Sequence, residues 1–161
     1  MPDVAEAVLV DGDADLVSMA RPMLADAELM KKAAEGREHE INTCIACNQA
    51  CLDHTFAMKT TSCLVNPRAC HETMIKWGPA ATTKNIVVVG AGPAGLAYAT
   101  VAAERGHAVT LFDAADEIGG QFNLAKQVPG KEEFHETLRH YRAMLEKYAV
   151  TVKLGERVNA A

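Results

Sequence analysis

The stretch NIVVVGAGPAG, residues 85–95, decides the fold of this chain. Its first half contains Ile86–Val89, an uninterrupted run of apolar β-branched residues that is typical of a central strand in a parallel sheet. Its second half is a glycine loop that opens a helix, which we predict from Pro93 to about Arg105. A strand that runs through such a loop into a helix is the usual start of a β-α-β unit.

The alternation of strand and helix continues after this stretch. A second strand is predicted at Ala108–Phe112 and a third at Val150–Leu154. Between them, apolar residues recur at spacings of four and three and form one face of an amphipathic helix: Phe134, Leu138, Tyr141, Leu145 and Tyr148. This order predicts an α/β fold with a parallel sheet and right-handed crossovers, the first half of a Rossmann-like domain.

The glycine loop has the chemistry of a dinucleotide site. Gly90 permits a tight turn, Gly92 lets the backbone approach a pyrophosphate, and Gly95 lets the helix lie close to the strand. Asp113 ends the next strand, where a carboxylate can accept hydrogen bonds from a ribose. The pattern does not separate FAD from NAD. The alternatives are a glycine turn without a ligand and, for Asp113, a simple turn or cap aspartate.

A glycine pair follows the second strand, in the stretch EIGGQ at residues 117–121. Gly120 and Gln121 belong to it. Such a pair would let a long cofactor continue past the glycine loop, which favours FAD. An ordinary turn is the alternative.

The cysteines form a second motif. Cys44, Cys47, Cys51 and Cys63 are spaced C-x2-C-x3-C-x11-C, and we call these four the pattern cysteines. Four thiolates can hold zinc or an iron–sulfur cluster. Zinc ribbons usually have two separated C-x2-C pairs, so the uneven spacing favours a [4Fe–4S] cluster. Zinc and buried structural thiols remain alternatives, and Cys70 is left out as a free cysteine.

Composition excludes several classes of protein. The net charge of −5 over 161 residues, with scattered Lys and Arg, gives no footprint for nucleic acid. The longest apolar runs are too short to cross a membrane, which takes about 20 residues. No secretory signal precedes the first acidic residues, so we expect a cytoplasmic protein. In that compartment clustered cysteines indicate metal rather than disulfides.

The chain is expected to have three parts. Residues 1–36 hold a short strand at Leu16–Met19 and a helix from about Asp26 to Glu35, with Gly36 just past its end. Residues 37–84 hold the cysteines and a linker without regular periodicity. Residues 85–161 are the start of the dinucleotide-binding domain. Neither the first part nor the sheet is complete, so we expect a fragment of a longer protein.

Four stretches resemble a known family. They are SMARP at 18–22, CIACNQAC at 44–51, SCLVNPRACHE at 62–72 and GGQF at 119–122. They are similar to the bacterial NADPH-dependent 2,4-dienoyl-CoA reductases, which belong with trimethylamine dehydrogenase among the iron–sulfur flavoproteins of the old-yellow-enzyme type. The resemblance runs from about Gly12 to Val158, and the cysteine segment is its most specific part.

The resemblance implies a three-cofactor enzyme: a TIM barrel with FMN and an acyl-CoA substrate, a linker with the cluster, and a domain that binds FAD and NADPH. Residues 1–36 would then be the end of the barrel, with Ala20 and Arg21 at the FMN phosphate. A surface salt bridge is the alternative for Arg21. On the FAD side the matching positions are Gly92, Ala94, Asp113, Gln121 and Lys131, with Val158 for a backbone contact to adenine.

The implied reaction passes electrons from NADPH through FAD, the cluster and FMN to an unsaturated thioester of fatty acid β-oxidation. No residue of this chain matches the proton donor, because the barrel and the NADPH domain are missing, and we expect the segment alone to be inactive. Two alternatives remain: an amine dehydrogenase or other flavin oxidoreductase of the same build, and a non-catalytic electron-transfer subunit.

Overall fold

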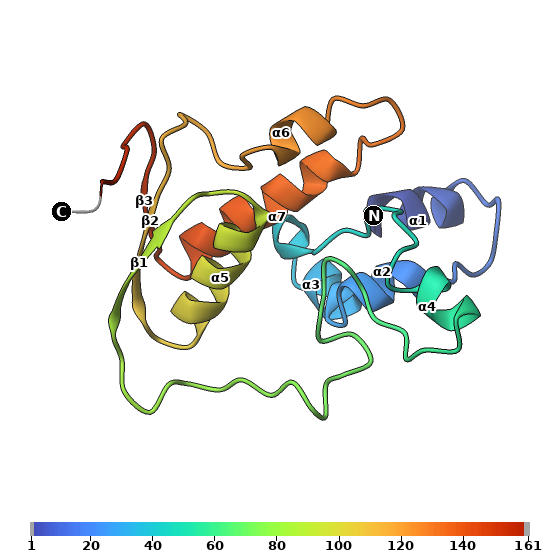
Figure 1. Cartoon of the computed structure of the whole chain (residues 1–161). Helices are drawn as coiled ribbons and strands as arrows, with labels where there is room; N and C mark the ends of the chain where they lie inside the picture. Colours follow the sequence, from blue (N-terminus) through green and yellow to red (C-terminus); the bar gives the residue numbers. More distant parts are fainter. Residues whose placement is uncertain (1, 160–161) are drawn as a thin grey trace. The chain divides into compact units, whose positions relative to one another are not determined.

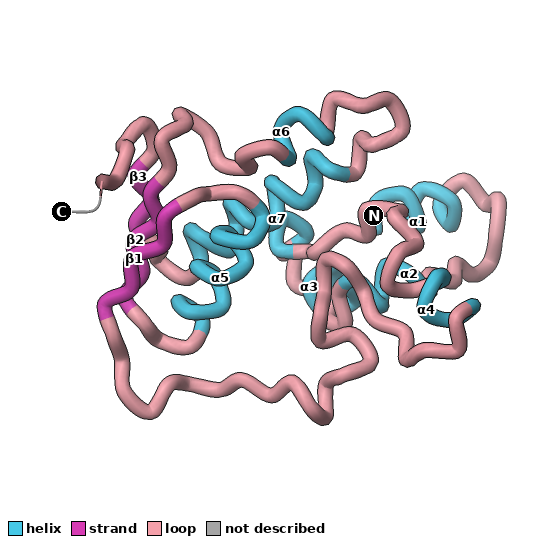
Figure 2. The backbone as a smooth tube through the Cα atoms, viewed as in Figure 1, coloured by secondary structure: helices cyan, strands magenta, loops and turns pink. Residues whose placement is uncertain are grey.

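The computed structural model describes residues 2–159, which divide into two compact units with the boundary between Ile75 and Lys76. Each unit holds one of the two motifs found in the sequence. The second unit contains a mixed α/β fold with a parallel sheet, as predicted. The first unit consists of short helices joined by long loops (Figure 2).

The second unit is built on three parallel strands in the order β1-β2-β3 (Figure 1): β1 is Asn85–Val89, β2 is Ala108–Phe112 and β3 is Thr151–Lys153. β1 and β2 pair along their whole length, from Asn85 opposite Ala108 to Val89 opposite Phe112. The three predicted strands are therefore confirmed, and the third is shorter than expected.

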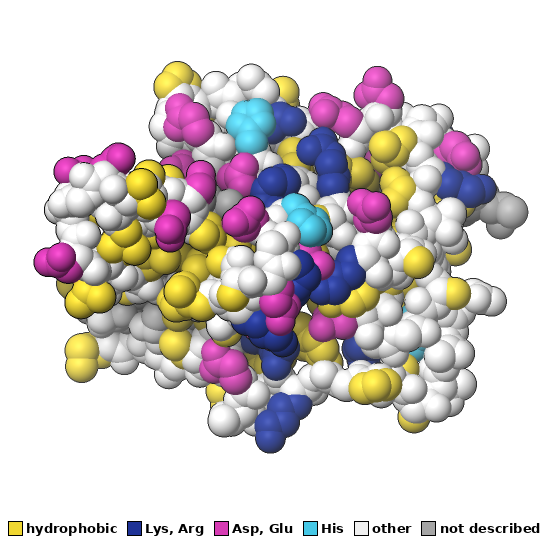
Figure 3. Space-filling view, turned by 180° about the vertical axis from the view of Figure 1, so that it is seen from behind, with side chains coloured by type: hydrophobic (Ala, Val, Ile, Leu, Met, Phe, Trp, Pro, Cys, Tyr) yellow, Lys and Arg dark blue, Asp and Glu magenta, His cyan; other side chains and the backbone are white. Residues whose placement is uncertain are grey.

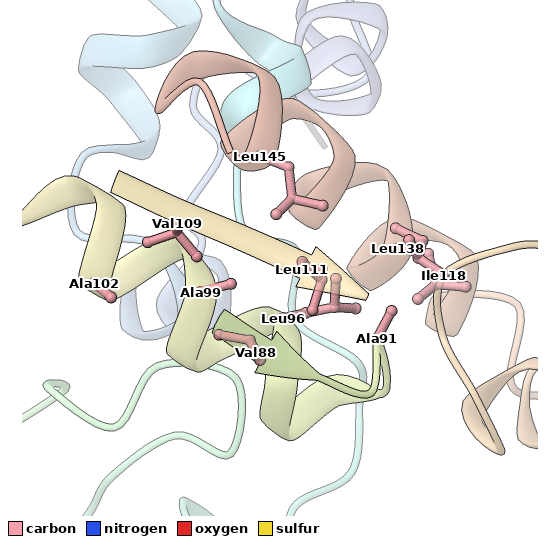
Figure 4. Close-up of a cluster of buried hydrophobic side chains, with 10 residues drawn as sticks. All are labelled: Val88, Ala91, Leu96, Ala99, Ala102, Val109, Leu111, Ile118, Leu138 and Leu145. Carbon is pink, nitrogen blue, oxygen red and sulfur yellow. The ribbon is translucent and has the colours of Figure 1, made fainter. Parts of the chain in front are cut away.

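Two helices cover one face of this sheet. They are α5, Pro93–Glu104, and α7, Phe134–Lys147, both predicted, and a short α6, Phe122–Ala125, lies between β2 and α7 in sequence. Their buried side chains meet those of the strands in a single core (Figure 4), with Leu96, Leu111 and Leu138 at most 1% exposed. On β1 the alternate residues Val87 and Val89 point to the other face and are more than 60% exposed.

The contact between α5 and β1 depends on a missing side chain. A Cβ atom placed on Gly95 would lie 1.8 Å from the Gly90 carbonyl oxygen and 3.5 Å from the Val88 side chain. No residue other than glycine fits at that separation. The absence of this methyl group lets the first turn of α5 lie directly against the end of β1, as the motif requires.

The first unit differs more from its prediction. The helix expected from Asp26 to Glu35 is confirmed only over α3, Leu29–Ala34, and a helix that was not predicted, α2, Ala20–Ala25, precedes it. Asp26, expected as a helix N-cap, is the C-cap of α2 and lies three residues before α3, where its carboxylate accepts hydrogen bonds from the backbone N–H groups of Glu28 and Asn42. Gly36 does follow the helix end in the left-handed conformation.

The strand predicted at Leu16–Met19 is wrong. These residues form no strand, and Leu16 is 88% exposed. A strand is stabilised by a neighbour that pairs with its backbone, and none is present within residues 2–75. The barrel edge therefore stays a prediction.

Besides α2, four described helices were not predicted. They are α1, Pro2–Val10, the 3-10 helix η1, Glu38–Glu40, α4, Leu52–Phe56, and α6. The last three are too short for a repeating apolar pattern to reveal them. None of the described helices is long and apolar enough to cross a membrane.

We predict that Gly95→Ala lowers the free energy of unfolding by about 3 kcal/mol, because the methyl group forces α5 and the Gly90 carbonyl apart. Gly92→Ala is the matched control, since no heavy atom lies within 4 Å of its added Cβ, and it should cost less than about 1 kcal/mol. Urea unfolding of both variants makes the comparison. Equal stability of the two would contradict the close approach described here.

Candidate functional site

The glycine loop connects the end of β1 to the start of α5. Gly90 has a φ of +103° and donates its backbone N–H to the Phe112 carbonyl at 2.7 Å, so the loop is tied to the end of β2. Gly92 is the N-cap of α5, and Pro93 follows at the first helical position. The first turn of a twelve-residue helix thus opens at this loop, which favours a phosphate there.

Asp113 braces the loop from the end of β2. Its Oδ2 accepts a hydrogen bond from the Ala91 N–H at 2.6 Å, and its Oδ1 accepts one from the Ala115 N–H at 2.8 Å. These N–H groups, Ala115 first and Ala91 second, hold the pKa of Asp113 below its usual value. The carboxylate retains lone pairs for a ribose. Asp113 therefore has an observed structural role, which is to hold the loop through Ala91 and Ala115. Its contact with a ribose stays a prediction.

The glycine pair after β2 folds back onto the same loop. Gly119 donates its N–H to the Ala91 carbonyl at 2.7 Å. A Cβ on Gly120 would lie 3.4 Å from the Gly92 Cα, and both Gly119 and Gly120 have positive φ angles. The two glycine motifs, separated in sequence, therefore form one surface.

Four other residues are predicted to contact FAD. Ala94 is exposed in the first turn of α5, and Gln121 is exposed at the start of α6. The Lys131 ammonium lies 5.4 Å from the centre of the Phe134 ring. Val158, after β3, is 43% exposed. Their roles toward FAD stay predictions.

The four pattern cysteines line one small cavity in the first unit, although Cys63 lies far from the other three in sequence. Each is half-buried, whereas Cys70 is exposed and does not line the cavity. The backbone has positive φ at Ala46 and Asn48, on either side of Cys47. This conformation curls the segment around the cavity.

The electrostatics of Cys63 reflect this grouping. Burial raises the pKa of its thiol. The Val65 and Asn66 N–H groups lower this pKa by a smaller amount, and the charges of Cys44 and Cys47 raise it by less still. Within residues 2–159, no group of three or more Cys, His, Asp or Glu side chains is arranged so that it could hold a metal ion. The cavity brings together the predicted ligands, and their metal stays a prediction.

Asparagines that the sequence did not single out hold the cysteine segments together. The Asn42 Nδ2 donates to the Val65 carbonyl at 2.7 Å, and the Asn66 Nδ2 donates to the Leu24 carbonyl at 3.0 Å. Both asparagines flank a cysteine, at distances of two and three residues along the chain. Their proximity to the cysteines in sequence was the signal from which a structural role could have been predicted.

Arg21 lies at this cavity as well. Its side chain lines the wall, and its Nη1 donates to the Asn48 Oδ1 at 3.1 Å. Ala20, the first residue of α2, is exposed. The predicted contact of these residues with an FMN phosphate stays a prediction.

The charges elsewhere on the surface are mixed: on the face seen in Figure 3, basic and acidic side chains are interspersed.

Comparison with known proteins identifies relatives of the whole segment. A family model described as an NAD(P)-binding Rossmann-like domain matches residues 88–147. The chain is 50% identical over 83% of its length to a metal reductase from Desulforamulus reducens, and 39% identical over 99% to an NADH oxidase from Thermoanaerobacter brockii. A solved 2-naphthoyl-CoA reductase in complex with 2-naphthoyl-CoA superimposes over 99% of the chain with a TM-score of 0.96 and 41% identity.

The chain is homologous to one segment of larger oxidoreductases. It spans a fifth to a quarter of their length: 20% of the metal reductase, 25% of the NADH oxidase and 24% of the naphthoyl-CoA reductase. The general kind of protein predicted from the sequence is supported, as is the Rossmann-like domain. The specific dienoyl-CoA reductase is not among the three relatives named here.

We predict that Asp113→Asn destabilises the second unit at pH 7. The asparagine oxygen can accept only one of the two N–H groups, and its own NH2 group opposes the other. Because the folded pKa of Asp113 is lowered, its contribution is present above the unfolded pKa of about 3.9 and is lost as the pH falls toward the folded value. Urea midpoints at pH 7 and pH 3 should therefore differ less in the variant than in the wild type.

Asp116→Asn is the control for this experiment, since Asp116 is exposed three residues further on. It should follow the wild type at both pH values. A wild-type midpoint for Asp113→Asn at pH 7 would rule out the bracing role.

Proposed function

We propose that this segment carries electrons inside an iron–sulfur flavoprotein oxidoreductase, with a [4Fe–4S] cluster on the pattern cysteines and FAD on the glycine surface. The observation that carries the proposal is that Cys44, Cys47, Cys51 and Cys63, and not Cys70, line a single cavity. Four thiols that converge from two separate segments form a suitable donor set for such a cluster. Zinc is the competing occupant, and the first experiment below separates the two.

The second unit supports FAD as the dinucleotide. The α5 N-terminus, with free backbone N–H groups at Ala94 and Gly95, faces a pyrophosphate in this proposal, and Gly92 lets it approach. The Gly119–Gly120 pair, bonded to Ala91, continues the surface beyond the loop, as a longer cofactor requires. Asp113 holds the loop and offers its remaining lone pairs to the ribose.

The division of labour follows from the chemistry of the cofactors. FAD held on the glycine surface would supply the acceptance of a hydride from NADPH, and a [4Fe–4S] cluster held by the pattern cysteines would supply single-electron transfer toward FMN. In this proposal the residues of the chain hold and orient these groups, and none is a catalytic proton donor. The barrel with FMN and the NADPH-binding part would belong to the same longer polypeptide, which would be cytoplasmic.

For the substrate we propose a conjugated acyl-CoA thioester, with a 2,4-dienoyl-CoA of fatty acid β-oxidation as the first candidate. The family resemblance of residues 62–72 supports the dienoyl thioester. The similarity to a 2-naphthoyl-CoA reductase supports reduction of a CoA thioester more broadly, because that protein is named for such a substrate.

We predict that the anaerobically reconstituted full-length protein contains about four irons and four acid-labile sulfides per chain in addition to its flavins. Cys51→Ser should lose most of both, because a cavity thiolate is removed. Cys70→Ser is the matched control and should retain them, since Cys70 is exposed outside the cavity. Metal analysis and sulfide assay make the measurement. Bound zinc without sulfide, or loss of iron in Cys70→Ser, would contradict the assignment.

The substrate is tested with the same protein under anaerobic conditions. We predict NADPH oxidation coupled to loss of the absorbance of a 2,4-dienoyl-CoA, with at least about tenfold lower kcat/KM for a secondary amine assayed in the oxidative direction. Turnover of 2-naphthoyl-CoA alone would replace the dienoyl thioester within the same class. Preference for the amine would exclude the thioester and leave the cofactor assignments standing.

A further inference from the structure

Arg21 brings a cationic group to the wall of the cysteine cavity. It is the second residue of α2, and its side chain lines the cavity beside the pattern cysteines. The other described residues of the lining are cysteines, apolar residues and Asn48, so Arg21 is the charged member of the set apart from the thiols themselves. This position suggests that Arg21 acts on whatever group the pattern cysteines bind.

The guanidinium is anchored by the cysteine segment. Asn48 accepts the hydrogen bond from Arg21 Nη1, and it lies directly after Cys47 with a φ of +60°. Asparagine is one of the few residues that adopt this left-handed conformation at low cost. The Asn48 carbonyl also accepts the Asp53 N–H at 3.1 Å, which fixes the backbone that carries the amide. The acceptor for Arg21 is thus part of the ligand loop.

The helix that carries Arg21 is tied to the fourth cysteine as well. The Asn66 Nδ2 donates to the Leu24 carbonyl near the end of α2, and Asn66 pairs with Cys63 in an isolated bridge. Both cysteine segments therefore contact α2 or its side chains. Arg21 is therefore positioned at the cavity by two contacts: its own hydrogen bond to Asn48, and the hydrogen bond from Asn66 that holds its helix.

A fixed positive charge in the wall of the cavity changes the electrostatics of electron uptake. Four thiolates give the cluster a negative charge, and its reduction adds one more electron. A nearby cation stabilises the reduced form more than the oxidised form, because the attraction grows with the negative charge. Since Arg21 is exposed, solvent and salt weaken the effect but do not abolish it.

We propose that Arg21, positioned by Asn48, raises the reduction potential of the cluster and so makes it a better acceptor for single electrons. The inference rests on the cluster of the proposed function. It gives Arg21 a task at the cysteine cavity that is separate from a contact with an FMN phosphate.

The test is a redox titration of the cluster, followed by the EPR signal of its reduced form in full-length protein stripped of FMN. Iron and sulfide are measured first in each sample. In Arg21→Gln, the ratio of reduced to oxidised cluster at a fixed ambient potential should fall about fivefold, which is ~40 mV for one electron. Arg21→Lys keeps the charge and should recover most of the shift. Arg142→Gln, the same change at a residue outside the cavity lining, should give none.

The outcomes separate the two levels of the proposal. A wild-type protein without iron and sulfide overturns the proposed function itself. A full cluster in Arg21→Gln at the wild-type potential overturns the role of Arg21, whether or not FMN affinity changes. If Arg21→Gln fails to retain the cluster, Asn48→Gly decides: glycine keeps the left-handed backbone and removes the anchor, and an unshifted potential there overturns the proposal.

Discussion

The contact between the Gly90 carbonyl and Gly95 is the constraint on which the second unit depends. It brings α5 against β1 at a distance that excludes even a methyl group, so the helix start, the loop and the strand end form one rigid corner. The other bracing contacts use that corner: Ala91 gives its N–H to Asp113 and its carbonyl to Gly119. A dinucleotide surface assembled from three separate turns is the consequence, and hydrogen bonds connect the three turns to one another.

The described part of the first unit, residues 2–75, contains no sheet, and a buried ion pair links α3 to its neighbouring segments. Lys32 Nζ binds the Asp26 carboxylate at 2.6 Å and the Glu40 carbonyl at 3.1 Å, with both charged residues less than 10% exposed. The Asp26 carboxylate also binds the Asn42 N–H, just before the cysteine segment. Removal of one partner of such a pair typically costs about 3–5 kcal/mol, because the other charge stays buried. The pair therefore fixes where the ligand loop begins.

Sequence reasoning succeeded where local pattern and tertiary structure impose the same period. The strands and long helices of the second unit were predictable because their apolar residues face one core. It failed in the first unit, where Asp26 was expected to start a helix and its carboxylate instead accepts hydrogen bonds from Glu28, two residues further on, and from Asn42. Asn42 lies sixteen residues from Asp26, and no local sequence pattern predicts a hydrogen bond over that separation. The cysteine grouping was predictable from spacing, whereas the Arg21–Asn48 contact depends on how α2 meets the loop.

The two proposed sites would explain why one segment can recur in enzymes with different substrates. In our proposal, a surface for a dinucleotide and a cavity lined by thiols determine how electrons enter and leave, and the substrate binds outside this segment. Relatives named as a metal reductase, an NADH oxidase and a naphthoyl-CoA reductase are similar to this segment, although their names describe different reactions. Electron transfer depends on the potential of each centre rather than on the shape of the substrate. Arg21, which in our proposal raises that potential, would therefore be a place where the segment can be adapted to its acceptor without any change of fold.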